Sequence, residues 1–261
     1  MIKEIFISLP IHLRERLIKA LDTNVISPPY SNAQLKAIIG TQQETENLLN
    51  ALLELEKLGF QGSSAALWIR TLEQARASMP QPELVWSGPE VPGVYARNTR
   101  QVYEALFQAA NQSIWISSYT YYDGKNTFDI LARRMDDNPN MKVTMLLNIK
   151  RNQGNCDSET ELIRKYATHF WKRNWPGKNQ PQVYYDPRSL NLDKPEGVLH
   201  AKAVVVDLES VFITSANLTE AAYDRNIELG MVIKDKSLAA SIVSHFQTLI
   251  DRKLLRILPK Y

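Results

Sequence analysis

The chain has 261 residues, 44% of them hydrophobic and 23% charged, with a formal net charge of +3. This is enough to bury a real core in one large domain or two small ones. The single cysteine, Cys156, excludes an intrachain disulfide. No apolar run is long enough to cross a bilayer, and Glu4 and Pro10 interrupt any signal-like start. We therefore expect a soluble, cytoplasmic protein with no membrane contact.

Residues 1–78 are predicted to form a small, all-helical domain. Apolar residues recur at helical spacing between turn residues, which predicts four helices at 11–21, 31–39, 41–59 and 63–77. Residues 1–90 carry eight basic and ten acidic side chains, a net charge of −2. This charge favours a protein-contact or packing role over a DNA-reading helix-turn-helix.

Residues 79–97 are rich in proline and glycine and are predicted to be an irregular linker. From 98 to 261 helical and strand patterns alternate. Helices are expected at 98–110, 128–135, 158–171 and 235–249, and strands at 113–117, 143–149, 182–185, 203–206, 211–213 and 254–258. This order predicts an α/β sandwich with helices on both faces of a sheet. The tyrosines of residues 118–122 either line a cleft at a strand end or pack at an edge.

Three polar pairs stand out among the apolar residues of 199–233. They are His200 with Lys202, Ser215 with Asn217, and Asn226 with Glu228. Residues two apart in a strand share a face, so each pair is predicted to project together and form a site. Asp207 has the opposite parity from His200, and we interpret it as a turn anchor that accepts backbone N–H groups. The alternative is an ordinary hairpin with scattered polar residues.

These residues resemble the signature of the phospholipase D superfamily. His200, Lys202 and Asp207 reproduce its His-x-Lys-x₄-Asp motif, and residues 214–217 (TSAN) are similar to the Gly-Ser-x-Asn that follows, with Thr214 in place of glycine. The likeness covers residues 98–258 and not the first ninety. It implies a phospholipase D-like α/β/α sandwich with a mixed sheet.

The resemblance also implies a mechanism that needs no metal or other cofactor. In it His200 attacks phosphorus to form a phosphohistidine, and Glu228 fixes the tautomer of the ring. Lys202 and Asn217 hold phosphate oxygens, and Ser215 makes a lesser phosphate contact. The catalytic residues would be His200, Lys202 and Glu228, and the substrate-binding residues Lys202, Ser215 and Asn217. No ligand cluster with metal spacing is present in the sequence.

A second imidazole must protonate the leaving group, and only His200 lies in the signature. We therefore predict a homodimer whose two His200 side chains meet across the interface. His169 is the alternative partner within the chain. His12 and His245 lie in amphipathic helices and are predicted to be structural.

Nine basic residues against four acidic ones give residues 142–188 a net charge of +5, which suits a polyanion. A helical N-terminal domain followed by a single phospholipase D-like domain resembles the DrmC proteins, the phospholipase D-like components of bacterial DISARM antiphage systems. This resemblance implies a nuclease acting on foreign DNA, with other defence proteins as further partners. A lipid phosphodiesterase and a non-enzymatic nucleic-acid-binding subunit stay open as alternatives.

Overall fold

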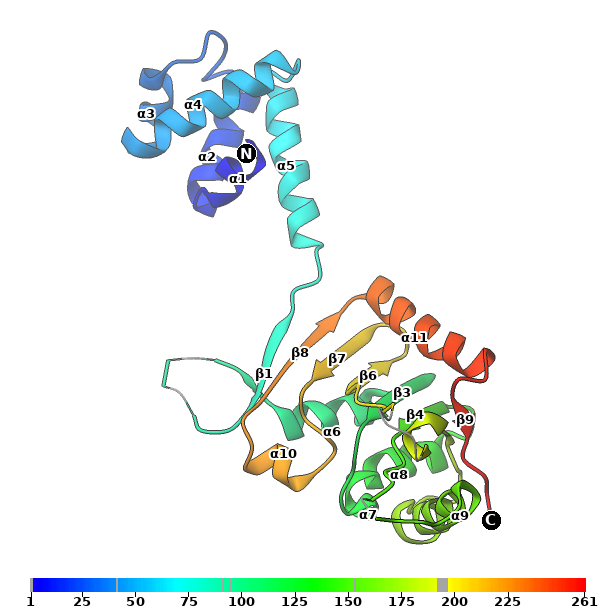
Figure 1. Ribbon diagram of the computed structural model, residues 1–261. Coiled ribbons are helices and arrows are strands. Elements are labelled where there is room, and N and C mark those ends of the chain that lie inside the picture. The colour runs from blue at the N-terminus through cyan, green and yellow to red at the C-terminus, as the bar shows by residue number, and fades with distance from the viewer. Residues whose placement is uncertain (1, 41, 91, 94, 153, 192–196) are drawn as a thin grey trace. The chain divides into compact units, whose positions relative to one another are not determined.

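The protein is described here from a computed structural model, which covers residues 2–40, 42–90, 92–93, 95–152, 154–191 and 197–261. The chain divides into two compact units, Met1–Met79 and Pro80–Tyr261. Figure 1 shows the helices of the first unit and the sheet of the second.

The described part of the first unit is helical. Its elements are α1 (Ile2–Ser8), α2 (Ile11–Asp22), α3 (Asn32–Ile39), α4 (Gln42–Lys57) and α5 (Ser63–Ala77). Ser31 starts α3 with a capping box, accepting from the backbone N–H of Gln34, whose side chain accepts from the backbone N–H of Ser31. The short α1 was not expected from the sequence; it is held by Phe6, which is fully buried and meets Trp68 edge to face.

The second unit is built on a nine-stranded mixed sheet with the order β2-β1-β8-β7-β6-β3-β4-β5-β9. The strands are β1 (Glu83–Ser87), β2 (Arg97–Asn98), β3 (Ser113–Ser118), β4 (Lys142–Leu147), β5 (Gln182–Tyr185), β6 (Ala203–Val206), β7 (Ser210–Thr214), β8 (Glu228–Lys234) and β9 (Arg256–Ile257). β3, β4 and β5 run parallel, whereas β6, β7, β8 and β1 alternate in direction.

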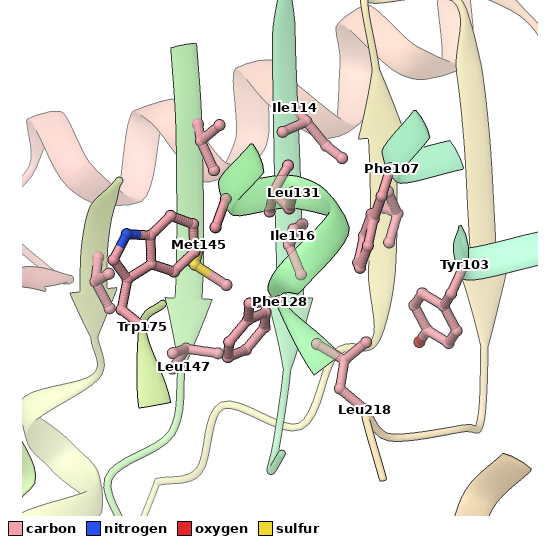
Figure 2. Close-up of a cluster of buried hydrophobic side chains, with 14 of the residues drawn as sticks. Tyr103, Phe107, Ile114, Ile116, Phe128, Leu131, Met145, Leu147, Trp175 and Leu218 are labelled. Carbon is pink, nitrogen blue, oxygen red and sulfur yellow. The ribbon is translucent and has the colours of Figure 1, made fainter. Parts of the chain in front are cut away.

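Helices cover both faces of this sheet (Figure 1). They are α6 (Thr99–Ala109), α7 (Gly124–Thr127), α8 (Asp129–Asp137), α9 (Glu159–His169), α10 (Glu220–Asp224) and α11 (Lys236–Asp251), with a π-helical turn η1 (Phe170–Asn174) and a 3₁₀ turn η2 (Pro187–Leu190). α6 and α8 pack in the main core with the inward side chains of β3 and β4, as Figure 2 shows for Ile114, Met145 and Leu131. α11 packs on the opposite face against Val205 and Val211. The α/β sandwich predicted from the sequence is confirmed.

The segment expected to be a linker contributes to the sheet. Residues 83–87 form β1, which pairs antiparallel with β8 from Glu83↔Val232 to Ser87↔Glu228. Val85 is fully buried in the main core. The prolines and glycines that suggested an irregular linker lie on either side of this strand, where they leave its ladder intact.

Candidate active site

The His200–Lys202 pair lies directly before β6, at the end of the sheet where β3 finishes. The strand begins at Ala203, as predicted, and the side chains of the pair before it meet. Nζ of Lys202 lies 3.1 Å from Nδ1 and 3.3 Å from Nε2 of His200, and it donates to the backbone oxygen of His200 at 2.9 Å. The carbonyl of Ala201 between them accepts from the hydroxyl of Ser117 at 2.9 Å, which fixes this segment against β3.

Lys202 is buried, with 7% of its surface exposed, whereas His200 is exposed. Burial lowers the pKa of Lys202 because it disfavours the charged ammonium, and the nearby carboxylate of Glu228 opposes this shift. The ring of Tyr119, directly after β3, lies 5.1 Å from the imidazole of His200 and 6.0 Å from Nζ of Lys202. Tyr119 therefore lines the site. Tyr121 instead packs against Phe128 in the main core.

Ser215 and Glu228 meet between the end of β7 and the start of β8. The hydroxyl of Ser215 donates to Oε2 of Glu228 and accepts from the backbone N–H of Leu229 at 3.1 Å. Nδ2 of Asn226 donates to Oε1 of Glu228 at 3.2 Å. The predicted pair of Asn226 and Glu228 therefore joins Ser215, one member of a second pair, in one hydrogen-bonded cluster, and Glu228 bonds within this cluster instead of to the ring of His200.

Asn217 lies in the loop after β7, and its side-chain oxygen Oδ1 is buried with no hydrogen-bond partner in the described part of the chain. A buried amide oxygen without a partner is costly. The Asn217 amide is thus a polar group near the site whose hydrogen-bonding capacity is incompletely used.

Asp207 supports the scaffold beneath the site. Its carboxylate accepts the backbone N–H groups of Asn111, Gln112 and Ser113 at 3.0, 2.7 and 2.8 Å. We expected it to anchor its own turn; its donors belong instead to the loop that leads into β3. The motif aspartate thus ties the β6–β7 turn to the start of the neighbouring strand.

Thr214, which replaces the glycine of the family pattern, is accommodated by a glycine on the next strand. Gly230 is its register partner. A Cβ on Gly230 would lie 2.9 Å from both Cβ and Oγ1 of Thr214. The Thr214 hydroxyl accepts from the backbone N–H of Ala216 at 3.0 Å, so it shapes the turn that carries Ser215.

A pocket of about 550 Å³ lies beside His200. Its lining includes His200, Lys202 and Ser215 together with His245 and Phe246 of α11. His245 was not predicted to lie here, because its helix is distant in the chain and its neighbours carry no motif. His169, the alternative second histidine, is exposed at the end of α9 and does not line this pocket.

The basic residues of 142–188 are only partly available to a ligand. Arg164, Lys165 and Arg188 form ion pairs with Glu161, Asp157 and Asp186. The buried guanidinium of Arg151 donates to three backbone carbonyls, those of Leu190, Asn155 and Asp157. Of the nine basic residues between 142 and 188, all of which the structure describes, the exposed ones without an ion pair are Lys142, Lys150, Lys172, Arg173 and Lys178.

Among the residues that the structure describes, no group of three or more His, Cys, Asp or Glu side chains is arranged to hold a metal ion. No helix there has the length and apolar character needed to cross a membrane.

The profile of a family described as "Cardiolipin synthase, PLD-like domain" matches residues 103–250. The chain belongs to this phospholipase D-like family. The match includes the His200–Lys202 pair, Asp207, Ser215, Asn217 and Glu228, so the superfamily expected from the motif is confirmed. It leaves out the helical unit and β1.

Among curated proteins the chain is similar to the phospholipase D of Rickettsia felis and that of Rickettsia conorii. Each is 36% identical over 64 residues, which is 24% of this chain and 30% of the relative. The match therefore spans less than a third of either relative.

Among solved structures this phospholipase D-like chain is similar to three proteins with a TM-score of 0.46 each. Nuc, a phospholipase D family member from Salmonella typhimurium, is 18% identical, with 70% of this chain and 100% of that one covered. NucT from Helicobacter pylori is 16% identical, with 66% and 97% covered. The phosphatidylserine synthase of Haemophilus influenzae is 16% identical, with 82% and 47% covered.

Proposed function

We propose that this phospholipase D-like chain is a metal-independent phosphodiesterase that cleaves nucleic acid, most favourably DNA, through a phosphohistidine at His200. The observation that carries the proposal is the arrangement at the end of the sheet. There, an exposed imidazole contacts a buried ammonium group, and that ammonium group lies within electrostatic range of the Ser215–Glu228 cluster. A nucleophile beside a buried cation suits attack on an anionic phosphorus centre.

The reaction would proceed in two in-line steps. A ring nitrogen of His200 bonds to phosphorus while the bond from phosphorus to the leaving oxygen breaks, and a second imidazole gives that oxygen its proton. Water then attacks phosphorus and loses a proton to the second imidazole, and the phosphorus–nitrogen bond breaks to restore His200. Lys202 would balance the charge on the non-bridging oxygens, and the amide of Asn217 would donate a hydrogen bond to one of them.

The second imidazole would come from a second copy of the chain. His200 is exposed and can reach a partner, and one imidazole cannot lie on both sides of phosphorus at once. A two-fold interface would present the same residue twice. The partner copy is therefore part of the proposed site.

The preference for DNA rests on the five exposed, unpaired basic residues named above and on the resemblance to DrmC. That resemblance also motivates the proposed role in defence against foreign DNA, in the cytoplasm, with other defence-system proteins as partners. Four of the nine basic residues are engaged within the protein, so the charge that remains for a polyanion is smaller than the sequence suggested.

A lipid phosphodiesterase is the second candidate. The matching family is described as cardiolipin synthase, and the relatives include proteins named phospholipase D and phosphatidylserine synthase. Phosphodiester chemistry is common to both substrates, so the site itself does not favour one of them.

The deciding experiment incubates wild-type protein and His200→Ala with single- and double-stranded DNA, with RNA and with anionic vesicles, all in EDTA. We expect wild type to cut DNA without added metal and His200→Ala to be inactive. Acid-labile, base-stable phosphate on wild-type protein during turnover would identify the phosphohistidine. Headgroup release with intact DNA would favour the lipid candidate, and DNA affinity without turnover on any substrate would favour a binding subunit.

The homodimer is tested on the same preparations by sedimentation. A mixture of wild-type subunits with an excess of His200→Ala subunits is the sharper arm. If each site draws one imidazole from each copy, every mixed dimer lacks one imidazole, so the excess variant should reduce the activity of the wild-type subunits. Unchanged wild-type activity after subunit exchange would contradict a shared site.

A further inference from the structure

The pocket beside His200 has a lining of mixed character. One part of it is His200, Lys202 and Ser215, the groups assigned to the phosphate. The rest includes Ile213 of β7 and Ile242, His245 and Phe246 of α11. A ligand that filled it would meet both the groups assigned to the phosphate and less polar side chains.

The hollow exists because small residues of the His-x-Lys segment face a helix with large ones. Ala201 and Ala203 line the pocket, and Ala203 pairs with Ile213 and Ser117 on the adjacent strands. Ile242, His245 and Phe246 occupy positions i, i+3 and i+4 and so share one side of α11. Phe246 is held there by stacking on Trp115 of β3, with ring centroids 6.4 Å apart and planes at 25°.

We propose that this pocket is a nucleobase subsite, which receives the base of a nucleotide attached to the scissile phosphate. The inference rests on the proposed nuclease function and deepens it. A base is planar and largely apolar on its faces, with polar edges, and every phosphodiester of a nucleic acid has such a group nearby. Phe246 and Ile242 supply apolar contact, and the exposed imidazole of His245 supplies a hydrogen-bonding group for a base edge.

The dimensions fit this occupant. A volume of about 550 Å³ falls in the ordinary range for small-molecule sites, about 300–1,000 Å³. A mixed lining of aliphatic, aromatic and imidazole groups suits a heterocycle better than an acyl chain, which offers no polar edge to His245. A base held in this subsite could not pair with the complementary strand at the same time. The subsite would therefore favour single-stranded or frayed substrate.

The test compares three dinucleotides. One carries thymine at both positions, and each of the other two replaces one of the two thymidines by an abasic tetrahydrofuran residue. Wild type should cleave the base-bearing dinucleotide with kcat/KM on the order of ten-fold above one of the abasic forms, the size expected for one stacked base. His245→Ala and Phe246→Leu should remove this preference by raising KM for the base-bearing form, with kcat nearly unchanged.

Ser244→Ala is the matched control, because Ser244 is an exposed neighbour on α11 that does not line the pocket. It should keep the wild-type preference. If wild type cleaves the base-bearing and both abasic dinucleotides with equal kcat/KM, the proposed subsite is overturned. A fall in kcat/KM that is the same for all dinucleotides in both pocket variants would also overturn it.

A binding measurement separates this inference from the proposed function. Calorimetric titration of His200→Ala protein with the same dinucleotides should show the base preference even if no dinucleotide is cleaved. A base preference in binding without any cleavage would count against the nuclease and leave the subsite standing. If His245→Ala and Phe246→Leu convert a dimer to a monomer, this surface is a contact between copies of the chain. If vesicle hydrolysis depends on both residues, the pocket binds lipid. Either result overturns the proposal.

Discussion

The ammonium group of Lys202 rests against the imidazole of His200, with Nζ 3.1 Å from Nδ1 and 3.3 Å from Nε2. An ammonium group only donates hydrogen bonds, so a ring nitrogen of His200 is the acceptor in this contact. A phosphate oxygen is a stronger acceptor than imidazole because it carries charge. Substrate binding would therefore draw Nζ away from the ring and leave the nitrogens of His200 free to react.

Replacing Lys202 by Met should raise stability and strongly reduce activity. Burial lowers the pKa of Lys202 below 10.5, so the unfolded chain binds this proton more tightly than the folded one. The free energy of unfolding then rises with pH between the lowered pKa and 10.5, and below that window the charge is a constant cost to the fold. Removal of the charge should raise Tm near neutral pH by a few degrees, about 2–4 °C per kcal/mol.

The measurements are thermal unfolding across the window up to pH 10.5 and phosphodiesterase activity at pH 7. Activity should fall by about 10²–10³-fold, the usual effect of losing one group that stabilises charge in the transition state. Lys234→Met is the control, because Lys234 is exposed at the end of β8 and should change neither quantity. A Lys202→Met protein that is both less stable and active would contradict this account of the site.

Glu228→Gln should lower activity with little effect on folding. Gln keeps one carbonyl oxygen for the Ser215 hydroxyl or the Asn226 amide, but it removes the charge that opposes the lowered pKa of Lys202. The pKa of Lys202 should therefore fall further. If activity requires the ammonium form, the alkaline limb of the pH–rate profile should move to lower pH in the variant, and an unchanged limb would show that Glu228 does not act through Lys202.

The contact between His200 and Lys202 was predictable from their spacing, because residues two apart are local. The parity argument paired Asn226 with Glu228, which do contact, but the contact of Ser215 with Glu228 depends on the pairing of β7 with β8. The donors to Asp207 could not be predicted from the sequence, because Asn111, Gln112 and Ser113 are almost a hundred residues away in the chain. Only the pairing of β3 with β6 brings them together.

The same limit explains β1 and His245. Glu83–Ser87 reads as linker because prolines flank it, and its strand conformation is decided by the ladder to β8. A lone histidine on an amphipathic helix carries no local signal of function, and its position depends on how α11 crosses the sheet. Sequence pattern therefore predicted the strands and the motif, and tertiary packing decided what surrounds them.

Asp207→Ala should destabilise the second unit while sparing the chemistry. The carboxylate accepts three backbone N–H groups, and hydrogen bonds to a charged group contribute about 1.5–3 kcal/mol each, without full additivity. We expect a loss of about 3 kcal/mol in urea unfolding, with kcat retained at temperatures where the protein stays folded. A variant of wild-type stability, or a folded one without activity, would show that Asp207 has a different role.

Leu208→Gly should stabilise the protein. Leu208 has φ 54° in the turn between β6 and β7, and Asp207 before it has φ 51°. A left-handed conformation costs a leucine about 1–2 kcal/mol, and Asp-Gly is a preferred sequence for a turn with two positive φ values. Glycine loses more entropy on folding, so a net gain of about 0.5–1 kcal/mol is expected in urea unfolding, with activity unchanged. Valine suits this φ less well than leucine, so Leu208→Val should lower the free energy of unfolding.

Thr214 and Gly230 should behave as a coupled pair. Gly230→Ala would place a Cβ 2.9 Å from Cβ and Oγ1 of Thr214 and 2.8 Å from Cε2 of Phe212, closer than side chains tolerate. Overpacking of this kind costs about 1–3 kcal/mol. Thr214→Gly alone should cost about 1 kcal/mol, because it removes the hydroxyl that accepts from the N–H of Ala216.

In the double variant Thr214→Gly removes two of the three close contacts, so the loss should be smaller than the sum of the single losses. A double-mutant cycle in urea should therefore give a coupling of about 1 kcal/mol that favours the double variant. Since Phe212 still meets the new Cβ, recovery should be incomplete. Simple additivity would show that the strand pair adjusts freely, and the glycine of the family pattern would then be interchangeable with threonine whatever residue lies opposite.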